Sequence, residues 1–241
     1  MDRFREIIRI SKEKNISLKY LHRREFETVF HSDKPIDSCS VHYPEEIEAT
    51  QGILASVSDY NYSDLETAVK KDFNDRSILV MLDGVTDVGN FGSILRNCSA
   101  FNVDGIIVPK NRSVSPGRRV SKISSGALEE ARIYSVVNLV NTIKKLKESG
   151  FWVYGTAPDQ DDKEVQDAAK MDFIFPAVFI FGSEQKGMGN LVRKNCDALV
   201  KIEHTGEMQS LNVSVTAGIL LYIIRQFEKG LKFQVERIIY N

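Results

Sequence analysis

The chain has 241 residues, of which 42% are hydrophobic, enough for one domain with a real core and a small attachment. No apolar run approaches the roughly 20 residues of a membrane span, and the first six residues lack the apolar region of a signal peptide. Cys39, Cys98 and Cys196 are widely spaced, which suits a reducing cytoplasm better than a disulfide framework. The histidines show no metal-ligand spacing. We therefore expect a cytoplasmic protein without a membrane segment or a metal site.

Charge is close to balanced but unevenly distributed, with 32 Lys/Arg and 33 Asp/Glu giving a net charge of -1. Residues 1–30 hold eight Lys/Arg against five Asp/Glu, and residues 31–75 hold three against ten. The remainder holds 21 against 18. Bulk charge therefore neither supports nor excludes a nucleic-acid partner, and local patches must decide.

The first quarter of the chain is predicted to form short elements joined by a linker. Amphipathic spacing predicts a helix over residues 2–14, and alternation predicts a strand over residues 16–20. A second helix is expected over residues 23–30. Residues 31–47 contain two prolines and little periodicity, which is typical of a loop or linker. A further helix is expected over residues 64–71.

From residue 76 onward, apolar runs alternate with amphipathic stretches. The predicted strands are 78–82, 105–108, 151–155, 177–181 and 198–202. The predicted helices are 90–101, 120–128, 138–149, 187–195 and 212–229. Such alternation indicates an α/β fold in which a parallel sheet carries helices on both faces.

Three short polar segments lie directly beside apolar runs. They are Asn90-Phe91-Gly92-Ser93-Ile94-Leu95-Arg96, Phe181-Gly182-Ser183-Glu184-Gln185-Lys186-Gly187-Met188 and Ser210-Leu211-Asn212-Val213-Ser214. Because the apolar runs belong in the core, we expect the polar residues where strands stop and helices begin, which is where open α/β folds bind ligands. The spacing within the first segment places Asn90 at a helix cap and Arg96 nearly two turns into the helix.

In this order, the three segments resemble the motifs of the SpoU-type (TrmH-like) RNA 2'-O-ribose methyltransferases of the SPOUT superfamily. The resemblance extends over about residues 76–229 and is closest to the branch that methylates guanosine in 23S ribosomal RNA. It implies S-adenosylmethionine as the cofactor, RNA as the substrate and a homodimer in which Arg96 completes the site across the interface. It also implies a C-terminal trefoil knot, in which the chain near residues 182–229 threads a loop.

The resemblance assigns roles to individual side chains. The implied catalytic residues are Asn90, Arg96, Glu184, Ser210 and Asn212. The implied cofactor contacts are Gly182, Ile202 and Leu211, and Thr156 is expected to line the same pocket because it follows a predicted strand. A ribose hydroxyl is a poor nucleophile, and a fixed guanidinium such as that of Arg96 can orient it and hold the developing charge. Whether Arg96 also acts as the base is left open.

Each of these residues also has a purely structural interpretation. Asn90 and Ser210 could simply cap helices, and Arg96 could be a surface cation. Glu184 could be a helix N-terminal carboxylate that the helix dipole favours. Leu211 could be a hydrophobic staple. The functional interpretation of Gly182 is that glycine lets the backbone approach an adenosine closely.

A dense basic cluster lies between residues 109 and 127, which contain five basic residues and no acidic one. The candidate RNA-binding residues in it are Arg112, Arg118, Arg119 and Lys122. We expect this loop to contact phosphates, and a solvated surface loop is the alternative.

The helix–strand–helix piece at the start resembles the back half of the substrate-recognition domain that often precedes the catalytic domain in this family. We therefore predict a short N-terminal α/β segment and linker over residues 1–47 and a methyltransferase domain over residues 48–241. The alternative is that this piece only caps the catalytic domain.

The function implied by the resemblance is 2'-O-ribose methylation of RNA, with ribosomal RNA favoured. Transfer RNA is an alternative substrate, and a non-catalytic RNA-binding factor of ribosome assembly is an alternative of a different class. A nicotinamide-dependent oxidoreductase is disfavoured, because the chain lacks the Gly-x-Gly-x-x-Gly pattern of dinucleotide-binding folds.

Overall fold

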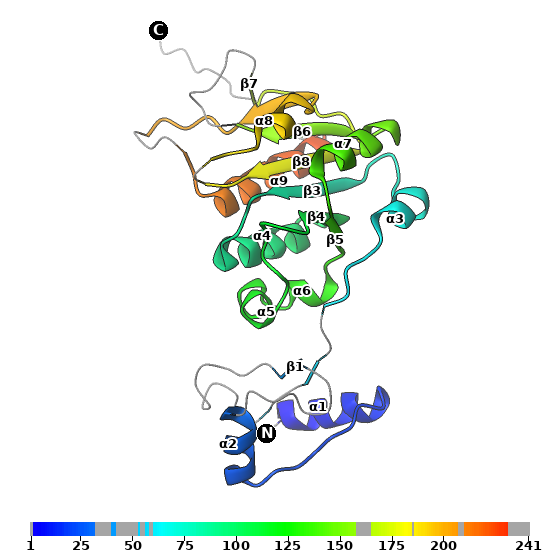
Figure 1. Cartoon of the computed structure of the whole chain (residues 1–241), viewed down its shortest axis with the longest axis vertical. Helices are drawn as coiled ribbons and strands as arrows, with labels where there is room; N and C mark the ends of the chain where they lie inside the picture. The colour runs from blue at the N-terminus through cyan, green and yellow to red at the C-terminus, as the bar shows by residue number, and fades with distance from the viewer. Residues whose placement is uncertain are drawn as a thin grey trace. The chain divides into compact units, whose positions relative to one another are not determined.

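A computed structural model of the chain describes residues 2–31, 40, 41, 53, 56, 57, 60–157, 165–184, 186–206 and 210–230 (Figure 1). The chain divides into two compact units, Met1–Asp59 and Tyr60–Asn241. The predicted boundary between residues 47 and 48 lies outside the described residues, as does most of the predicted linker over residues 31–47. Both therefore stay predictions.

The first unit contains two helices and a two-stranded antiparallel pairing. Its elements are α1 (Asp2–Glu13), α2 (Arg23–His31), β1 (Ser40–Val41) and β2 (Ser56–Val57). Both predicted helices are confirmed. The predicted strand over residues 16–20 is wrong: this stretch pairs with none of the described strands, and Tyr20 is 79% exposed. Alternation alone does not make a strand where no neighbouring strand satisfies the backbone.

The second unit is built on a seven-stranded parallel sheet in the order β5-β4-β3-β8-β6-β9-β7. Its strands are β3 (Ile78–Asp83), β4 (Gly105–Pro109), β5 (Ile133–Val136), β6 (Trp152–Thr156), β7 (Val165–Asp167), β8 (Ala177–Gly182) and β9 (Ala198–Lys201). The five predicted strands are confirmed as β3, β4, β6, β8 and β9. The two that were missed, β5 and β7, are short edge strands.

Helices cover both faces of this sheet (Figure 1). They are α3 (Leu65–Lys71), α4 (Val88–Ala100), α5 (Arg118–Ser124), α6 (Ala127–Glu130), α7 (Leu139–Glu148), α8 (Asn190–Lys194) and α9 (Val213–Glu228). Successive side chains of a strand point to opposite faces, so Ile78, Val80 and Leu82 pack in the core with α4, α5, α6 and α9. Leu79 and Met81 pack in the core with α3, α7 and α8. The predicted α/β fold is thereby confirmed, and no described helix is long and apolar enough to cross a membrane.

The predicted helices are present, with changed bounds. The helix predicted over residues 120–128 is two helices, α5 and α6, because Ser125 and Gly126 have φ angles of 53° and 91° and cannot continue a right-handed helix. The helix predicted over residues 187–195 is reduced to α8, since its first residues belong to the loop after β8.

Parallel strands bring their carboxyl ends to one edge of the sheet. Asp83 of β3 is in register with Gly182 of β8, and Thr156 of β6 is in register with Val200 of β9. Ends of four strands that are distant in sequence therefore lie together, at the edge where open α/β sheets bind ligands.

Candidate active site

A triangle of side-chain hydrogen bonds joins the three polar segments. Asn90 Nδ2 donates to Glu184 Oε1 over 3.1 Å, and Asn212 Nδ2 donates to Asn90 Oδ1 over 2.9 Å. Asn212 Nδ2 also donates to Glu184 Oε1. One carboxylate oxygen thus accepts from two amides, and this fixes the orientation of all three side chains. The structure brings together three of the five predicted catalytic residues.

The start of α4 presents Asn90 to this triangle. The helix cap is Asp87, whose carboxylate accepts from the Asn90 backbone N–H over 2.7 Å. The prediction that Asn90 caps the helix was therefore wrong. Asp87 is three residues upstream, the usual spacing for a capping carboxylate, so the sequence held the signal. Because Asp87 satisfies the backbone, the Asn90 amide is available to Glu184 and Asn212.

The start of α9 presents Asn212 in a different way. Asn212 is itself the cap of α9, and its Oδ1 accepts from the backbone N–H of Ser214 over 2.9 Å and from its hydroxyl over 2.6 Å. Its Nδ2 remains free to enter the triangle. Ser210 is exposed two residues before this cap, so its alternative interpretation as the helix cap is wrong.

Glu184 is held by a tight loop at the end of β8, here called the β8 loop, whose described residues are 182–184 and 186–189. Ser183 and Gly187 exchange backbone hydrogen bonds of 3.0 and 2.8 Å across the loop. Gly187 has a φ angle of 62°, a left-handed conformation that favours glycine. Glu184 therefore lies at the tip of a closed turn, and its side chain is exposed.

Gly182 is required by the β8 loop itself. A Cβ atom on this residue would lie 2.2 Å from the carbonyl carbon of Gly187 and 2.3 Å from the backbone nitrogen of Met188. The loop folds directly back over the last residue of β8, and only glycine leaves room for it. The sequence prediction attributed this glycine to the approach of a ligand, whereas the structure provides an internal reason for it.

The other predicted cofactor residues lie at the carboxyl ends of neighbouring strands. Thr156 ends β6 and donates its hydroxyl to the carbonyl oxygen of Ile180 over 3.0 Å, which ties β6 to β8. Ile202 directly follows β9, and Leu211 directly precedes the Asn212 cap. Both side chains are half-buried. They offer partly accessible apolar surface close to where Thr156 and Gly182 end their strands.

Arg96 is the predicted catalytic residue that the structure does not bring into the triangle. Its side chain is exposed on α4, and it makes no hydrogen bond or ion pair with any described residue. A six-residue step along an α-helix corresponds to about 9 Å of rise and about 120° of net rotation. Arg96 and Asn90 therefore project from different sides of the same helix.

The predicted basic loop is only partly a loop. Residues 110–117 form the connection after β4, in which Arg112 is exposed with a φ angle of 61°. The chain then enters α5, on which Arg119 and Lys122 are exposed. A Cβ atom on Gly92 of α4 would lie 2.7 Å from the side chain of Ile123, so α5 packs directly on α4.

Neither described cysteine has the character of a nucleophile. Burial raises the pKa of the Cys196 thiol to about 12, and it raises the pKa of the fully buried Cys98 thiol as well. Both are therefore protonated at neutral pH. In the described part of the chain, no group of three or more His, Cys, Asp or Glu side chains could hold a metal ion.

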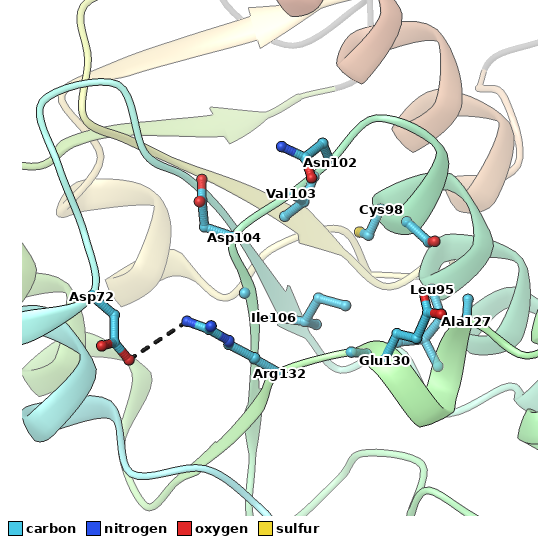
Figure 2. A pocket seen from close by; sticks show the side chains of 13 residues that line it. Asp72, Leu95, Cys98, Asn102, Val103, Asp104, Ile106, Ala127, Glu130 and Arg132 are labelled. Carbon is cyan, nitrogen blue, oxygen red and sulfur yellow. Dashed lines mark hydrogen bonds and ion pairs between the residues drawn. The ribbon is translucent and has the colours of Figure 1, made fainter.

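A separate pocket of about 360 Å³ lies at the opposite edge of the sheet, where β4 begins at Gly105. Figure 2 shows the ion pair between Arg132 and Asp72 (3.5 Å) on one side of this pocket, with Leu95 on the other. None of the predicted site residues lines it. The candidate site is therefore defined by the strand ends and the triangle.

Comparison with known proteins gives the family. Residues 77–222 match the model of the SpoU rRNA Methylase family, and the chain belongs to this family. YacO of Bacillus subtilis, named as a TrmH family tRNA/rRNA methyltransferase, is 34% identical over 219 residues, which cover 90% of this chain and 80% of YacO.

Two solved structures that resemble this chain contain the cofactor AdoMet, S-adenosylmethionine. The SpoU methyltransferase AviRb from Streptomyces viridochromogenes, in complex with AdoMet, aligns with a TM-score of 0.62 at 26% identity, over 73% of this chain and 69% of AviRb. The AdoMet-bound rRNA methyltransferase from Sinorhizobium meliloti aligns with a TM-score of 0.62 at 25% identity, over 71% of this chain and 62% of that protein.

Proposed function

We propose that this protein transfers a methyl group from AdoMet to a ribose 2'-oxygen of RNA, with ribosomal RNA favoured over transfer RNA. The observation that carries the proposal is the triangle of Asn90, Glu184 and Asn212. It joins one polar side chain from each of the three segments that resemble the family's motifs. A protein that had kept only the fold for binding would have no need to orient these three groups so closely.

AdoMet would lie against the carboxyl ends of β8, β6 and β9. At Gly187, no atom lies within 4 Å of the place where a side chain would stand, so the β8 loop has open space beside its backbone. Ile202 and Leu211 offer apolar surface suited to an adenine ring. Thr156 would lie on the floor between them, and Gly182 would allow the β8 loop to lie directly over the end of β8. When bound, the cofactor would supply a methyl group attached to a positively charged sulfur. The positive charge already activates this sulfur as the leaving group.

The side chains of the triangle would orient the ribose, because their own hydrogen bonds hold them in fixed positions. Ser210, exposed beside the Asn212 cap, adds a hydroxyl at the same site. Arg96 would hold the charge that develops on the 2'-oxygen as it loses its proton. A guanidinium that the partner's site held in place would do this with little reorganisation at the moment of reaction.

The proposed active form is a homodimer in which Arg96 acts on the partner's site. Support comes from an exposed apolar stripe on α9, in which Val215, Ile219 and Tyr222 are 48%, 36% and 46% exposed. Their spacing places them on one side of the helix. α9 packs against α4, where the Asn97 side chain donates to the Ser214 carbonyl oxygen over 2.8 Å. The residue next to Arg96 thus contacts the helix that carries the stripe.

The proposed RNA surface runs from α4 onto the loop after β4 and α5. α5 contacts α4 at Gly92, one helical turn before Arg96. Arg112, Arg118, Arg119 and Lys122 would contact phosphates in this region, without reading sequence directly. The N-terminal segment over residues 1–47 would help to recognise the RNA substrate. The methyltransferase domain over residues 48–241 would carry out the reaction. The enzyme would act on RNA in the cytoplasm.

We also propose that the C-terminal part of the second unit forms a trefoil knot. The support is the strand order: β8 lies between β3 and β6, β9 lies between β6 and β7, and the chain then returns to pack α9 on α4. Single-molecule pulling on cysteines placed at both ends of this unit would test the proposal. A knotted chain keeps a tightened knot and extends less than its residue number allows, and full extension would contradict the knot.

The proposed activity can be tested with isotopically labelled methyl groups. The protein would be incubated with AdoMet labelled on the methyl group and with unmodified transcripts of ribosomal or transfer RNA. A 2'-O-methyl group protects the adjacent phosphodiester from alkali, so labelled alkali-resistant dinucleotides are expected from ribosomal RNA. Label in transfer RNA alone would show that the substrate is transfer RNA and not ribosomal RNA. Label in the mononucleotides that alkali releases would refute ribose methylation. RNA binding without any transfer would favour the assembly factor.

A further inference from the structure

A carboxylate outside the proposed catalytic set reaches the β8 loop. Asp83 is the last residue of β3, and its register partner on β8 is Gly182, the first residue of the loop. Asp83 Oδ2 accepts a hydrogen bond from the backbone N–H of Gly189 over 2.7 Å. The bond links the end of one strand to the last residue of a loop that is 106 positions further along the chain.

This contact completes a three-point attachment of the β8 loop. At its start, the loop continues directly from β8, with Gly182 packed under the backbone of the Gly187–Met188 segment. Towards its end, the Met188 side chain packs over Gly155 of β6, where a Cβ atom would lie 2.6 Å from Met188 Cε. At its last residue, Asp83 holds Gly189. The loop is thus fixed to β8, β6 and β3, whose ends form the floor of the proposed cofactor site.

We propose that Asp83 is a positioning residue for AdoMet binding. It acts through the β8 loop and touches neither the cofactor nor the ribose. By fixing the Gly189 amide, it sets the backbone of residues 187–189 in the position that the cofactor requires before the cofactor arrives. The inference rests on the proposed function, since it assumes that AdoMet binds against this loop.

The chemistry of the contact predicts how substitutions rank. A carboxylate that accepts from a backbone N–H forms a charge-assisted hydrogen bond, which is stronger than a neutral one. Asp83→Asn keeps the shape and one acceptor oxygen, so the loop should stay close to its place. Asp83→Ala removes the acceptor and frees the end of the loop. Preorganisation would then be lost, and binding would have to supply the ordering that the protein no longer provides.

The chain offers a matched control at the other end of the same strand. Asp104 Oδ2 accepts from the backbone N–H of Ile78 over 2.8 Å, at the point where β3 begins. Both carboxylates therefore accept from a backbone amide at an end of β3, but only Asp83 contacts the β8 loop. Asp104→Ala should lower the free energy of unfolding and leave AdoMet affinity unchanged.

The experiment measures AdoMet affinity by calorimetric titration of the whole protein, together with hydrogen exchange of the Gly189 amide by NMR. We expect Asp83→Ala to weaken AdoMet binding about tenfold or more, Asp83→Asn to remain within about threefold of the wild type, and Asp104→Ala to match it. Hydrogen exchange of the Gly189 amide should accelerate in Asp83→Ala, less strongly in Asp83→Asn, and not in Asp104→Ala.

Two results would overturn the inference. One is wild-type AdoMet affinity in Asp83→Ala, and the other is an equal loss of affinity in Asp104→Ala, which would reveal a general effect of destabilising the sheet. Failure of the proposed cofactor binding is a different result, because the wild-type protein itself would then not bind AdoMet. Gly189 exchange would in that case still show whether Asp83 anchors the loop.

Discussion

The close approach of the β8 loop to Gly182 predicts a large effect from a single methyl group. In Gly182→Ala, the new Cβ would lie 2.2 Å from the Gly187 carbonyl carbon, whereas ordinary contact begins near 3.4 Å. The loop must therefore move by about 1.2 Å, since a backbone atom cannot rotate away as a side chain can. Overpacking of this kind costs about 1–3 kcal/mol of stability. Because the displaced residues line the proposed site, AdoMet affinity should fall as well.

The assay compares urea unfolding and AdoMet titration for Gly182→Ala and Gly105→Ala. At Gly105, a Cβ would lie 2.4 Å from Tyr134 Cε2, at the opposite edge of the sheet. We expect both variants to lose stability but only Gly182→Ala to lose affinity. The double variant Asp83→Ala/Gly182→Ala should lose less AdoMet affinity than the sum of the losses in the two single variants, because both substitutions displace the same segment. Unchanged AdoMet affinity in a folded Gly182→Ala protein would refute the reasoning.

Four further predictions concern other parts of the second unit. Arg96→Ala should bind AdoMet normally yet lose turnover about 100-fold or more, and Arg96→Lys should rescue poorly, since a point charge does not reproduce a planar fork. Mixed dimers of Arg96→Ala with Asn212→Ala should regain part of the activity in single-turnover assays, and inactivity with both parents folded would contradict action across the interface. Replacing Arg112, Arg118 and Arg119 with Ala should weaken RNA binding and flatten its salt dependence, whereas an identical salt slope would leave these residues without phosphate contacts. Because burial raises the pKa of Cys196 to about 12, iodoacetamide should alkylate it far more slowly in the native protein than in urea, and equal rates would contradict that burial.

Four of the five strands predicted from the sequence, β3, β4, β6 and β8, are buried on both faces. Continuous apolar runs such as residues 78–82 and 177–181 are typical of central strands in a parallel sheet that is covered on both faces. The short edge strand Val165–Asp167 carries two polar residues and gives no such signal. The order of the strands was also beyond local reasoning. β3 and β8 are neighbours through contacts between residues about 100 positions apart, and no local pattern encodes such contacts.

For the site, the sequence named three residues that the structure brings together, but it did not predict the hydrogen bonds between them. Asn90, Glu184 and Asn212 were expected at helix starts and strand ends, and they lie there. Which of them caps a helix depends on whether a neighbouring side chain already accepts from the backbone N–H groups at the helix start. Asp87 takes the α4 cap from Asn90, while Asn212 caps α9 with one amide atom and enters the triangle with the other. The contact of Asp83 with Gly189 was not predicted, because it joins the end of β3 to a loop that is 106 positions further along the chain.

The geometry of α4 supports our proposal that the site is completed by a second copy of the chain. Asn90 and Asn97 are seven residues apart, close to two full helical turns, and both contact the start of α9. Arg96 is rotated by about 100° from Asn97, so it projects away from the triangle and is exposed. We therefore propose that the arginine serves a ribose held by the triangle of another molecule. In this proposal, a second copy would bind on the exposed stripe of α9, the helix that the Asn97 side chain contacts.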